Sequence, residues 1–368
     1  MKTTRHTAAV LLIASTILAL PFTSRASDSM DLSARAAVLY EPTTGEFIYS
    51  KNQNERLGMA STTKIMTALI ALEYLDLEKE IEVDDRAIGI DGSSIYLEKG
   101  EIMTAESLIY SLMLRSANDA AEALAYEISE SIEDFCRLMN ERAISLGLSD
   151  TSFKNPHGLD AKDHYTTAHD LAIISAEALK NPKFKQISST YKKDVQSNIK
   201  TRTLINHNKL LKKYDDCIGI KTGYTQKCGR SLVGAAERDG LTLISVTIDA
   251  PNDWADHKKL LDLGFETFRT VKVMDAGEFA FALPIINGDP ESVNVTNKDA
   301  VRIVTRSNAS NIQREISLPR FLTNDVRVGD TVGSIIFRID GNIVAQTELI
   351  AKESSNIKKK GFFQRIFK

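Results

Sequence analysis

The sequence predicts an α+β domain followed by a small all-β module. In residues 27–270, strand-like segments lie near both ends and helical segments lie between them, which favours one sheet built from the first and last parts of the domain. In residues 271–352 the segments are short and β-rich, with turn signals between them. The 368 residues suffice for both, and a formal net charge of -3 gives no indication of nucleic-acid binding.

The first 26 residues predict a secretory signal peptide. Lys2 and Arg5 give a basic start, residues 8–22 form an apolar run, and Ser24 and Ala26 form an A-x-A-like cleavage site. An uncleaved N-terminal anchor is the alternative, although the run is shorter than the ~20 apolar residues that span a bilayer. We therefore expect an exported protein.

Hydrophobic periodicity and turn residues place the elements in order. Residues 34–49 alternate around a turn and predict a β-hairpin, and the stretch from 61 to about 77 is apolar on nearly every side, which predicts a helix in the domain interior. Further helices are expected at 104–114, 118–128, 132–146, 166–179 and about 254–268, and the helix-ending pair Asn181-Pro182 follows the fourth of them. Strands are expected at 217–225, 231–236 and 241–248, and in the module at 301–305, 331–338 and 343–349.

Cysteine and histidine give no metal motif. The three cysteines are an odd number, which excludes a fully paired disulfide framework. Cys217 and Cys228 flank one strand and are able to pair, but two free thiols are favoured over a disulfide. The nearest approach to a ligand cluster is His157, His164 and His169, which lack the carboxylate pattern of a zinc site. We expect neither a metal nor a cofactor.

The spacing S-x-x-K occurs at Ser61, Ser189, Ser197 and Ser355. Only Ser61 opens a buried helix, in which positions i and i+3 share a face and bring the amine of Lys64 to the hydroxyl of Ser61. A serine nucleophile needs a base, and a lysine serves when burial and a second cation disfavour its charged form. A helix start also favours negative charge beside Ser61. The alternative is that Ser61 only caps the helix.

Two further motifs follow along the chain. Ser116-Ala117-Asn118 is an S-x-N triplet at which a helix starts, and its alternative interpretation is a capping Asn118 beside a loop serine. Lys221-Thr222-Gly223 is the sole K-T-G and lies on a strand, where Gly219 and Gly223 leave room for close backbone approach. An ordinary strand with an exposed lysine is the alternative. Each motif alone is weak, and the order of all three is the specific signal.

These motifs resemble the signature of penicillin-binding proteins and serine β-lactamases. Residues 60–67 and 219–225 are similar to the low-molecular-mass D-alanyl-D-alanine carboxypeptidases in particular. The resemblance covers residues 33–268 and extends to the β module and the C-terminal tail. It implies a β-lactamase/transpeptidase-like domain, an antiparallel sheet with a helical cluster, that acts on peptidoglycan stem peptides and takes β-lactam antibiotics as covalent inhibitors.

The resemblance implies a catalytic role for three residues. Ser61 would attack the carbonyl between two D-Ala residues and form an acyl-enzyme, with Lys64 accepting its proton. Ser116 would relay a proton to the departing D-Ala, and Asn118 would hold the substrate amide.

The remaining implied residues bind substrate from the strand. Lys221 and Thr222 of the K-T-G triplet, which Gly223 completes, would bind the terminal carboxylate, and the backbone N–H groups of Ser61 and Tyr224 would form the oxyanion hole. This sequence has Ala117 where the family usually has Gly. Some relatives also place an Arg after the last sheet strand, but residues 249–256 contain none, so that carboxylate contact is unassigned.

Three other functions compete with this one. A class A β-lactamase needs a Glu for deacylation, but residues 149–163 contain none and read Asn155-Pro156-His157-Gly158-Leu159, as the carboxypeptidases do. An acyl-enzyme with penicillin is therefore expected to persist. A non-catalytic cell-wall-binding protein on the same fold and a metallopeptidase that acts on the same dipeptide also stay open.

Residues 353–368 predict a basic amphipathic tail. Phe362, Phe363, Ile366 and Phe367 share one helical face, opposite Gln364, Arg365 and Lys368. Such a segment binds the headgroup zone of a membrane, with basic residues attracted to anionic lipid. A frayed basic tail is the alternative. Together with export, the tail predicts a location at the outer face of the cytoplasmic membrane.

Overall fold

The computed structural model describes residues 30–308 and 311–358. The first domain is built on a five-stranded antiparallel sheet of order β2-β1-β9-β8-β7. Its strands are β1 (Ala36–Glu41), β2 (Glu46–Lys51), β7 (Cys217–Thr225), β8 (Gly229–Arg238) and β9 (Leu241–Ile248). Because β1 pairs with β9, the first and last parts of the domain share one sheet, as the sequence predicts.

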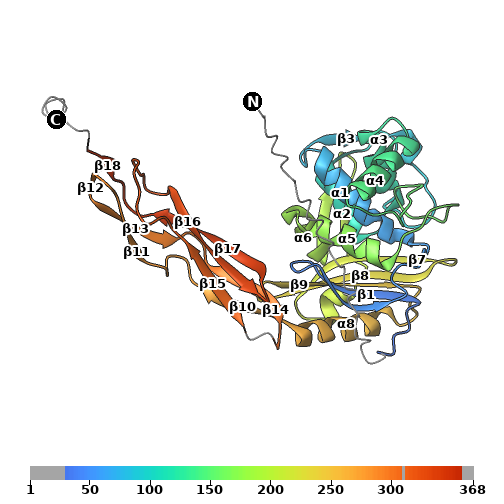
Figure 1. The fold of residues 1–368 in the computed structure, drawn as a ribbon. Helices are drawn as coiled ribbons and strands as arrows, with labels where there is room; N and C mark the ends of the chain where they lie inside the picture. The colour runs from blue at the N-terminus through green and yellow to red at the C-terminus, as the bar shows by residue number, and fades with distance from the viewer. Residues whose placement is uncertain (1–29, 309–310, 359–368) are drawn as a thin grey trace, which may run out of the picture. The chain divides into compact units, whose positions relative to one another are not determined.

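Helices cover both faces of this sheet. Figure 1 shows α8 (Asp253–Thr267) on one face and the helical cluster on the other. The cluster contains α1 (Lys64–Tyr74), α2 (Ala105–Leu114), α3 (Asn118–Ile128), α4 (Ile132–Ser145), α5 (Ala168–Leu179) and α6 (Pro182–Ser189). The expected α+β fold with a helical cluster is confirmed. Helix α1 packs against α2, α3, α4, α5 and α6, which explains why it is apolar on nearly every side.

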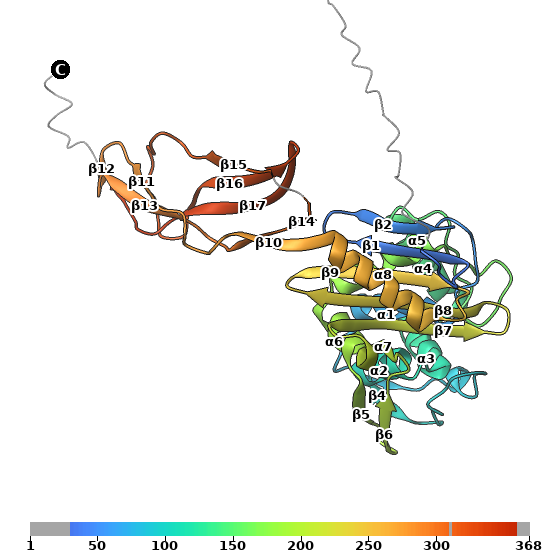
Figure 2. The same cartoon turned by 90° about the horizontal axis from the view of Figure 1, so that it is seen from below.

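Small elements complete the domain around the cluster. They are the 3₁₀ helices η1 (Ala60–Thr63) and η2 (Asp85–Ala87), the short helix α7 (Leu210–Lys213), and the strand pairs β3 (Glu80–Glu82) with β4 (Ile102–Thr104) and β5 (Lys192–Gln196) with β6 (Thr201–Ile205). Figure 2 shows the hairpin of β5 and β6 beside β4 and α2.

The C-terminal module is all-β, as expected. Its main sheet has the order β11-β13-β17-β16-β15, and β10 pairs with β14 and β12 with β18. The strands are β10 (Phe268–Met274), β11 (Phe281–Pro284), β12 (Gly288–Asp289), β13 (Ser292–Asn297), β14 (Val301–Arg306), β15 (Ile312–Ser317), β16 (Thr331–Ile339), β17 (Asn342–Ala351) and β18 (Asn356–Ile357). Leu283, Ile303, Phe337 and Leu349 belong to its apolar core.

Two regions differ from the sequence-based expectation. Asn181-Pro182 follows α5 but also begins α6, because the Asn181 side chain accepts hydrogen bonds from the backbone N–H groups of Lys183 and Phe184 and proline suits the first helical turn. The segment after α6 contains β5 and β6, which the sequence pattern missed because Val195 and Leu204 are their only buried side chains.

The predicted signal peptide and residues 359–368 of the predicted tail lie outside the described residues. Within the described part of the chain, no helix combines the length and the apolar character needed to cross a membrane.

Candidate active site

Ser61 lies in a tightly held turn. It is part of η1, immediately before α1, and neither element has a side-chain cap, so Ser61 is not the helix cap that the alternative interpretation required. Ala60 has a φ of 47°, a left-handed conformation that is uncommon for a residue with a side chain. The hydroxyls of Thr62 and Thr63 donate to the carbonyl oxygens of Met59 (2.6 Å) and Ala60 (2.8 Å). The nucleophile is thus presented by a fixed backbone.

Gly158 packs directly against this turn. A Cβ atom at this position would lie 1.9 Å from the carbonyl oxygen of Ala60, and the glycine has a φ of 92°. Both observations require glycine here. The loop that carries it therefore supports the residue that precedes the nucleophile.

Lys64 directs its amine at Ser61. Its Nζ lies 3.2 Å from Ser61 Oγ, 2.7 Å from Asn118 Oδ1 and 2.6 Å from the carbonyl oxygen of His157. The orientation of the Asn118 amide is set because Nδ2 donates to the carbonyl of Asp91 at 2.6 Å. The last two partners of Lys64 only accept, so they take both hydrogens of a neutral amine and leave its lone pair for the Ser61 hydroxyl.

The neutral form of Lys64 is favoured by its surroundings. Lys64 is fully buried, and desolvation, followed by the nearby charge of Lys221, holds its pKa well below the ordinary value, against the opposing effect of Asp119. Lys221 is also buried, and desolvation lowers its pKa to about 7. The alternative interpretation of the K-T-G triplet, an ordinary strand with an exposed lysine, is therefore wrong. Two buried amines that interact disfavour double protonation, which suits Lys64 to the role of base.

Ser116 is held in a strained conformation with an unused hydroxyl. It precedes α3 with a φ of 58°, and it is only 4% exposed. Within the described part of the chain, its Oγ has no hydrogen-bond partner. Buried hydroxyls are normally paired, and strain of this kind concentrates at functional sites. Asn118 is the first residue of α3 and does not cap it, since its side chain bonds to Lys64 and Asp91.

Each of the three motifs contributes residues to the lining of one cavity of about 670 Å³. Ser61, Ser116, Thr222, Gly223 and Tyr224 are among the residues that line it. Strand β7 forms the edge of the sheet here, and a Cβ at Gly223 would lie 3.1 Å from the backbone nitrogen of Ser61. The close approach that the K-T-G glycine predicts is therefore present. Segments that lie far apart in the sequence thus contribute to the same cavity.

This cavity also contains an arginine, Arg230, that no sequence motif indicated. Arg230 on β8 is the cross-strand partner of Tyr224 and lines the cavity with Trp254. Its Nε and Nη2 donate to the buried carboxylate of Asp253 at 2.9–3.1 Å, and no hydrogen-bond partner of Nη1 occurs among the residues that the structure covers. Residues 249–256, after the last strand of the sheet, contain no arginine. The pairing of β7 with β8 places Arg230 opposite Tyr224 and so brings a guanidinium to the cavity from a different strand.

The three histidines of the apparent ligand cluster serve other purposes. The Nε2 of His157 lies 3.3 Å from Glu122, and His169 contacts Asp170. His164 Nδ1 accepts the N–H of Lys154, so Nε2 carries the proton and donates to Thr63 Oγ1 at 2.9 Å. Across residues 30–308 and 311–358, no group of three or more His, Cys, Asp or Glu residues is placed to hold a metal ion. Cys136, Cys217 and Cys228 are free.

Comparison with known proteins gives this arrangement a family. The family model for D-alanyl-D-alanine carboxypeptidase matches residues 23–252, and that for the penicillin-binding protein 5 C-terminal domain matches residues 268–356. The chain belongs to the D-alanyl-D-alanine carboxypeptidase family. It is 34% identical over 340 residues to the D-alanyl-D-alanine carboxypeptidase DacF of Bacillus subtilis, covering 89% of this chain and 87% of that protein.

Solved structures of this family share the fold. Penicillin-binding protein 5 from Haemophilus influenzae matches with a TM-score of 0.65 and 28% identity, over 90% of this chain and 99% of that one. Penicillin-binding protein D2 from Listeria monocytogenes, solved in an ampicillin-bound form, matches with a TM-score of 0.60 and 30% identity, over 65% of this chain and all (100%) of that one. The protein is thus a serine peptidase of the D-Ala-D-Ala carboxypeptidase family, which favours this function over the three competing ones.

Proposed function

We propose that residues 27–270 remove the terminal D-alanine from peptidoglycan stem pentapeptides through an acyl-enzyme on Ser61. The observation that carries the proposal is the amine of Lys64, whose Nζ lies 3.2 Å from Ser61 Oγ and has two carbonyl acceptors as its other partners. In acylation, Lys64 takes the hydroxyl proton as Ser61 Oγ bonds to the peptide carbonyl carbon. The C–N bond then breaks and D-Ala leaves.

The departing amine needs a proton, and Ser116 is the proposed relay. Its buried, unpaired hydroxyl lines the same cavity as Ser61. A hydroxyl both donates and accepts hydrogen bonds. Ser116 therefore passes its proton to the leaving nitrogen and takes a replacement from the ammonium group of Lys64, which holds the proton removed from Ser61. Asn118 holds the substrate amide in addition to orienting Lys64.

The terminal carboxylate is proposed to bind beside Thr222, between two cations. Lys221 is buried next to Thr222 and Arg230 lines the cavity, so an anion placed here is able to receive charge-assisted hydrogen bonds. Binding the anion raises the pKa of Lys221 and keeps it charged. The backbone N–H groups of Ser61 and Tyr224 supply the oxyanion hole, supported by the contact of η1 with β7.

β-Lactams are proposed as covalent inhibitors of Ser61. The loop that contains Gly158 has no glutamate to activate a deacylating water, so the acyl-enzyme is expected to persist. The ampicillin-bound form of the Listeria relative supports this proposal.

The proposed setting is the outer face of the cytoplasmic membrane. A signal peptide in residues 1–26 would export the chain, and the basic amphipathic tail in residues 353–368 would bind the membrane surface. The β module in residues 271–352 would connect the catalytic domain to this tail.

Release of D-alanine tests the proposed reaction. Purified protein without residues 1–26 is expected to release free D-Ala from a pentapeptide, and penicillin is expected to block the release. Ser61→Ala should abolish both the release and labelling by fluorescent penicillin, because it removes the nucleophile. Ser189→Ala removes the serine of another S-x-x-K match and should leave both unchanged. Persistent labelling of Ser61→Ala would place the nucleophile elsewhere.

A further inference from the structure

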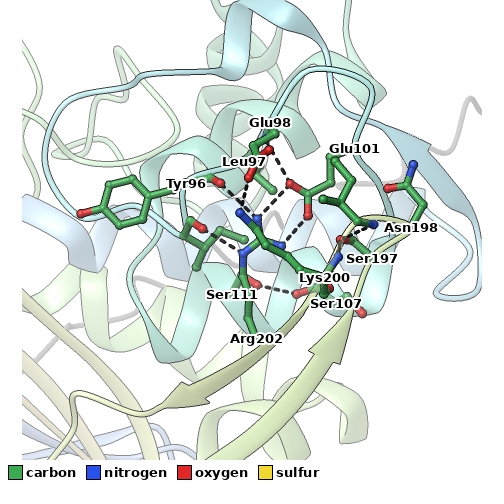
Figure 3. A network of polar contacts seen from close by, with 12 residues as sticks. Tyr96, Leu97, Glu98, Glu101, Ser107, Ser111, Ser197, Asn198, Lys200 and Arg202 are labelled. Atoms are coloured by element: carbon green, nitrogen blue, oxygen red, sulfur yellow. Dashed lines mark hydrogen bonds and ion pairs between the residues drawn. The ribbon is translucent and has the colours of Figure 1, made fainter.

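A buried ion pair joins two parts of the domain that border the cavity. Loop 91–101, between η2 and β4, contains neither helix nor strand and contributes Ser93 to the cavity lining. The hairpin of β5 and β6 contributes Ile205 to the same lining. Figure 3 shows Arg202 of β6 directed into this loop, beside Glu101 and Tyr96.

The inner side of the loop is bound to the start of α3. The carbonyl oxygens of Asp91 and Ser93 accept hydrogen bonds from the Asn118 side chain (2.6 Å) and backbone N–H (2.7 Å). The carboxylate of Asp119, which is 1% exposed, accepts the backbone N–H groups of Ile95 and Leu97 within 3.2 Å. Because Asn118 also contacts Lys64, a displacement of this loop moves a partner of the proposed base.

The outer side of the loop is bound to Arg202. Its Nε donates to the carbonyl of Ile95 at 2.9 Å, and its Nη2 donates to the carbonyl of Tyr96 at 3.1 Å and to Glu101 Oε2 at 2.9 Å. Nη1 forms the second arm of the pair with Glu101. The Glu101 side chain is 0% exposed and that of Arg202 is 11% exposed. Removing one partner would leave the other as an uncompensated buried charge.

The hairpin of β5 and β6 is connected to loop 91–101 by further contacts besides the ion pair of Arg202 and Glu101. Asn198, at the turn of the hairpin, accepts the backbone N–H of Ile102 at 2.8 Å and donates to the carbonyl of Gly100 at 3.0 Å. Lys200 pairs with Glu98 at the surface. The end of the hairpin is therefore attached to the loop, while its base borders the cavity.

We propose that Arg202 is a positioning residue for the carboxypeptidase reaction. It holds loop 91–101 against the start of α3, and through Asn118 it sets the direction of the Lys64 lone pair and the separation of two cavity walls. This inference rests on the proposed roles of Lys64 and Asn118. Misplacement of a reacting group by about 1 Å costs on the order of 100-fold in rate, so a contact remote from the nucleophile is able to control turnover.

Substitution of Arg202 tests the proposal by kinetics. Arg202→Ala is expected to lower kcat for D-Ala release, and the rate constant of acylation by penicillin, by about 10- to 100-fold. KM should change less than kcat, because the carboxylate-binding residues on β7 and β8 are untouched. The kcat of Arg202→Lys should also be low, because a lysine ammonium cannot form the same set of hydrogen bonds as the planar guanidinium, which donates to one carboxylate and two carbonyl oxygens. Glu101→Gln should give an intermediate loss.

Arg142→Ala is the matched control. Arg142 is also partly buried, with a 25% exposed side chain, and bridges Glu73 and Glu177 at 2.8 Å, and none of these three residues lines the cavity. Arg142→Ala should lower thermal stability but change kcat by less than about threefold, because the substitution destabilises the fold without displacing residues of the cavity. Equal kinetic losses in Arg142→Ala and Arg202→Ala, or a normal kcat in Arg202→Ala, would overturn the proposal.

Hydrogen exchange gives a readout that does not depend on the chemistry. Arg202→Ala and Arg202→Lys should increase exchange at the amides of Ile95 and Leu97, which bond to Asp119, without equal increases in β8 or β9. Unchanged exchange in both folded variants would contradict the positioning role even if activity fell. Absence of penicillin labelling in the unsubstituted protein would instead contradict the proposed function. The exchange measurement would still show whether Arg202 holds loop 91–101 in place.

Discussion

Lys221 is buried in the folded protein, and this burial disfavours the charged form of its amine. Its pKa of about 7 in the folded protein lies below the ordinary 10.5, so unfolding takes up a proton between these pH values. The lysine therefore lowers stability most at and below about pH 7, and the penalty shrinks as the pH rises toward 10.5. We expect Lys221→Met to raise the melting temperature by several degrees at pH 7 while abolishing D-Ala release.

The comparison of melting temperatures at two pH values checks the cause. The gain from Lys221→Met should be smaller at pH 10 than at pH 7, because the unfolded lysine is then partly neutral. A gain independent of pH would indicate better packing of methionine and not relief of desolvation.

Arg230 is expected to act on substrate binding. Arg230→Gln removes the guanidinium from the cavity but keeps an amide able to bond to Asp253. Because a hydrogen bond to a charged group contributes about 1.5–3 kcal/mol, KM for the pentapeptide should rise about 10- to 100-fold with a smaller change in kcat. Arg238→Gln is the control, since Arg238 pairs with Asp216 at the other end of β8. An unchanged KM in Arg230→Gln would remove Arg230 from the carboxylate site.

At the scale of elements, the nucleophile depends on contacts from a distant loop. Gly158→Ala is expected to place a methyl group into the Ala60 carbonyl and to strain a left-handed backbone. We predict at least a 10-fold slower acylation by penicillin and a lower melting temperature. Gly147→Ala, also at positive φ but with no atom within 4 Å of the added Cβ, is the matched control and should affect acylation little. Equal acylation by both variants would contradict the proposed support of η1.

The sequence predicted those elements whose residues carry a strong pattern. Helix α1 is apolar on nearly every side and its burial follows, and the spacing of Ser61 and Lys64 on one face follows from helical geometry. The hairpin of β5 and β6 was missed because each strand buries one side chain, so period-two alternation is nearly absent. Arg230 was missed for another reason: its place in the cavity follows from strand pairing, which a linear pattern does not contain.

The whole molecule is expected to lose stability in acid through its buried histidines. His257 is fully buried between Ser245 and Thr247, and desolvation lowers its pKa to about 3; burial also lowers the pKa of His164 to about 4. Each binds a proton more readily when unfolded, so stability falls as the pH drops from the ordinary value of 6.5 toward these values. Thermal melts between pH 7 and pH 4 should show this fall.

A substitution at His257 tests that assignment. His257→Gln keeps hydrogen-bonding groups for Ser245 and Thr247 but does not titrate, so its melting temperature should fall less between pH 7 and pH 4. A fall equal to that of the unsubstituted protein would attribute the acid sensitivity to other groups.

The pairing of β1 with β9 has a consequence for how the chain reaches its native state. Ala36 lies opposite Ile248, so the middle of the sheet joins segments from opposite ends of the first domain. Closing so large a loop before any strand pairing compensates for it makes folding slow. Nearly the whole first domain must therefore be present before the sheet that supports the serine is able to form.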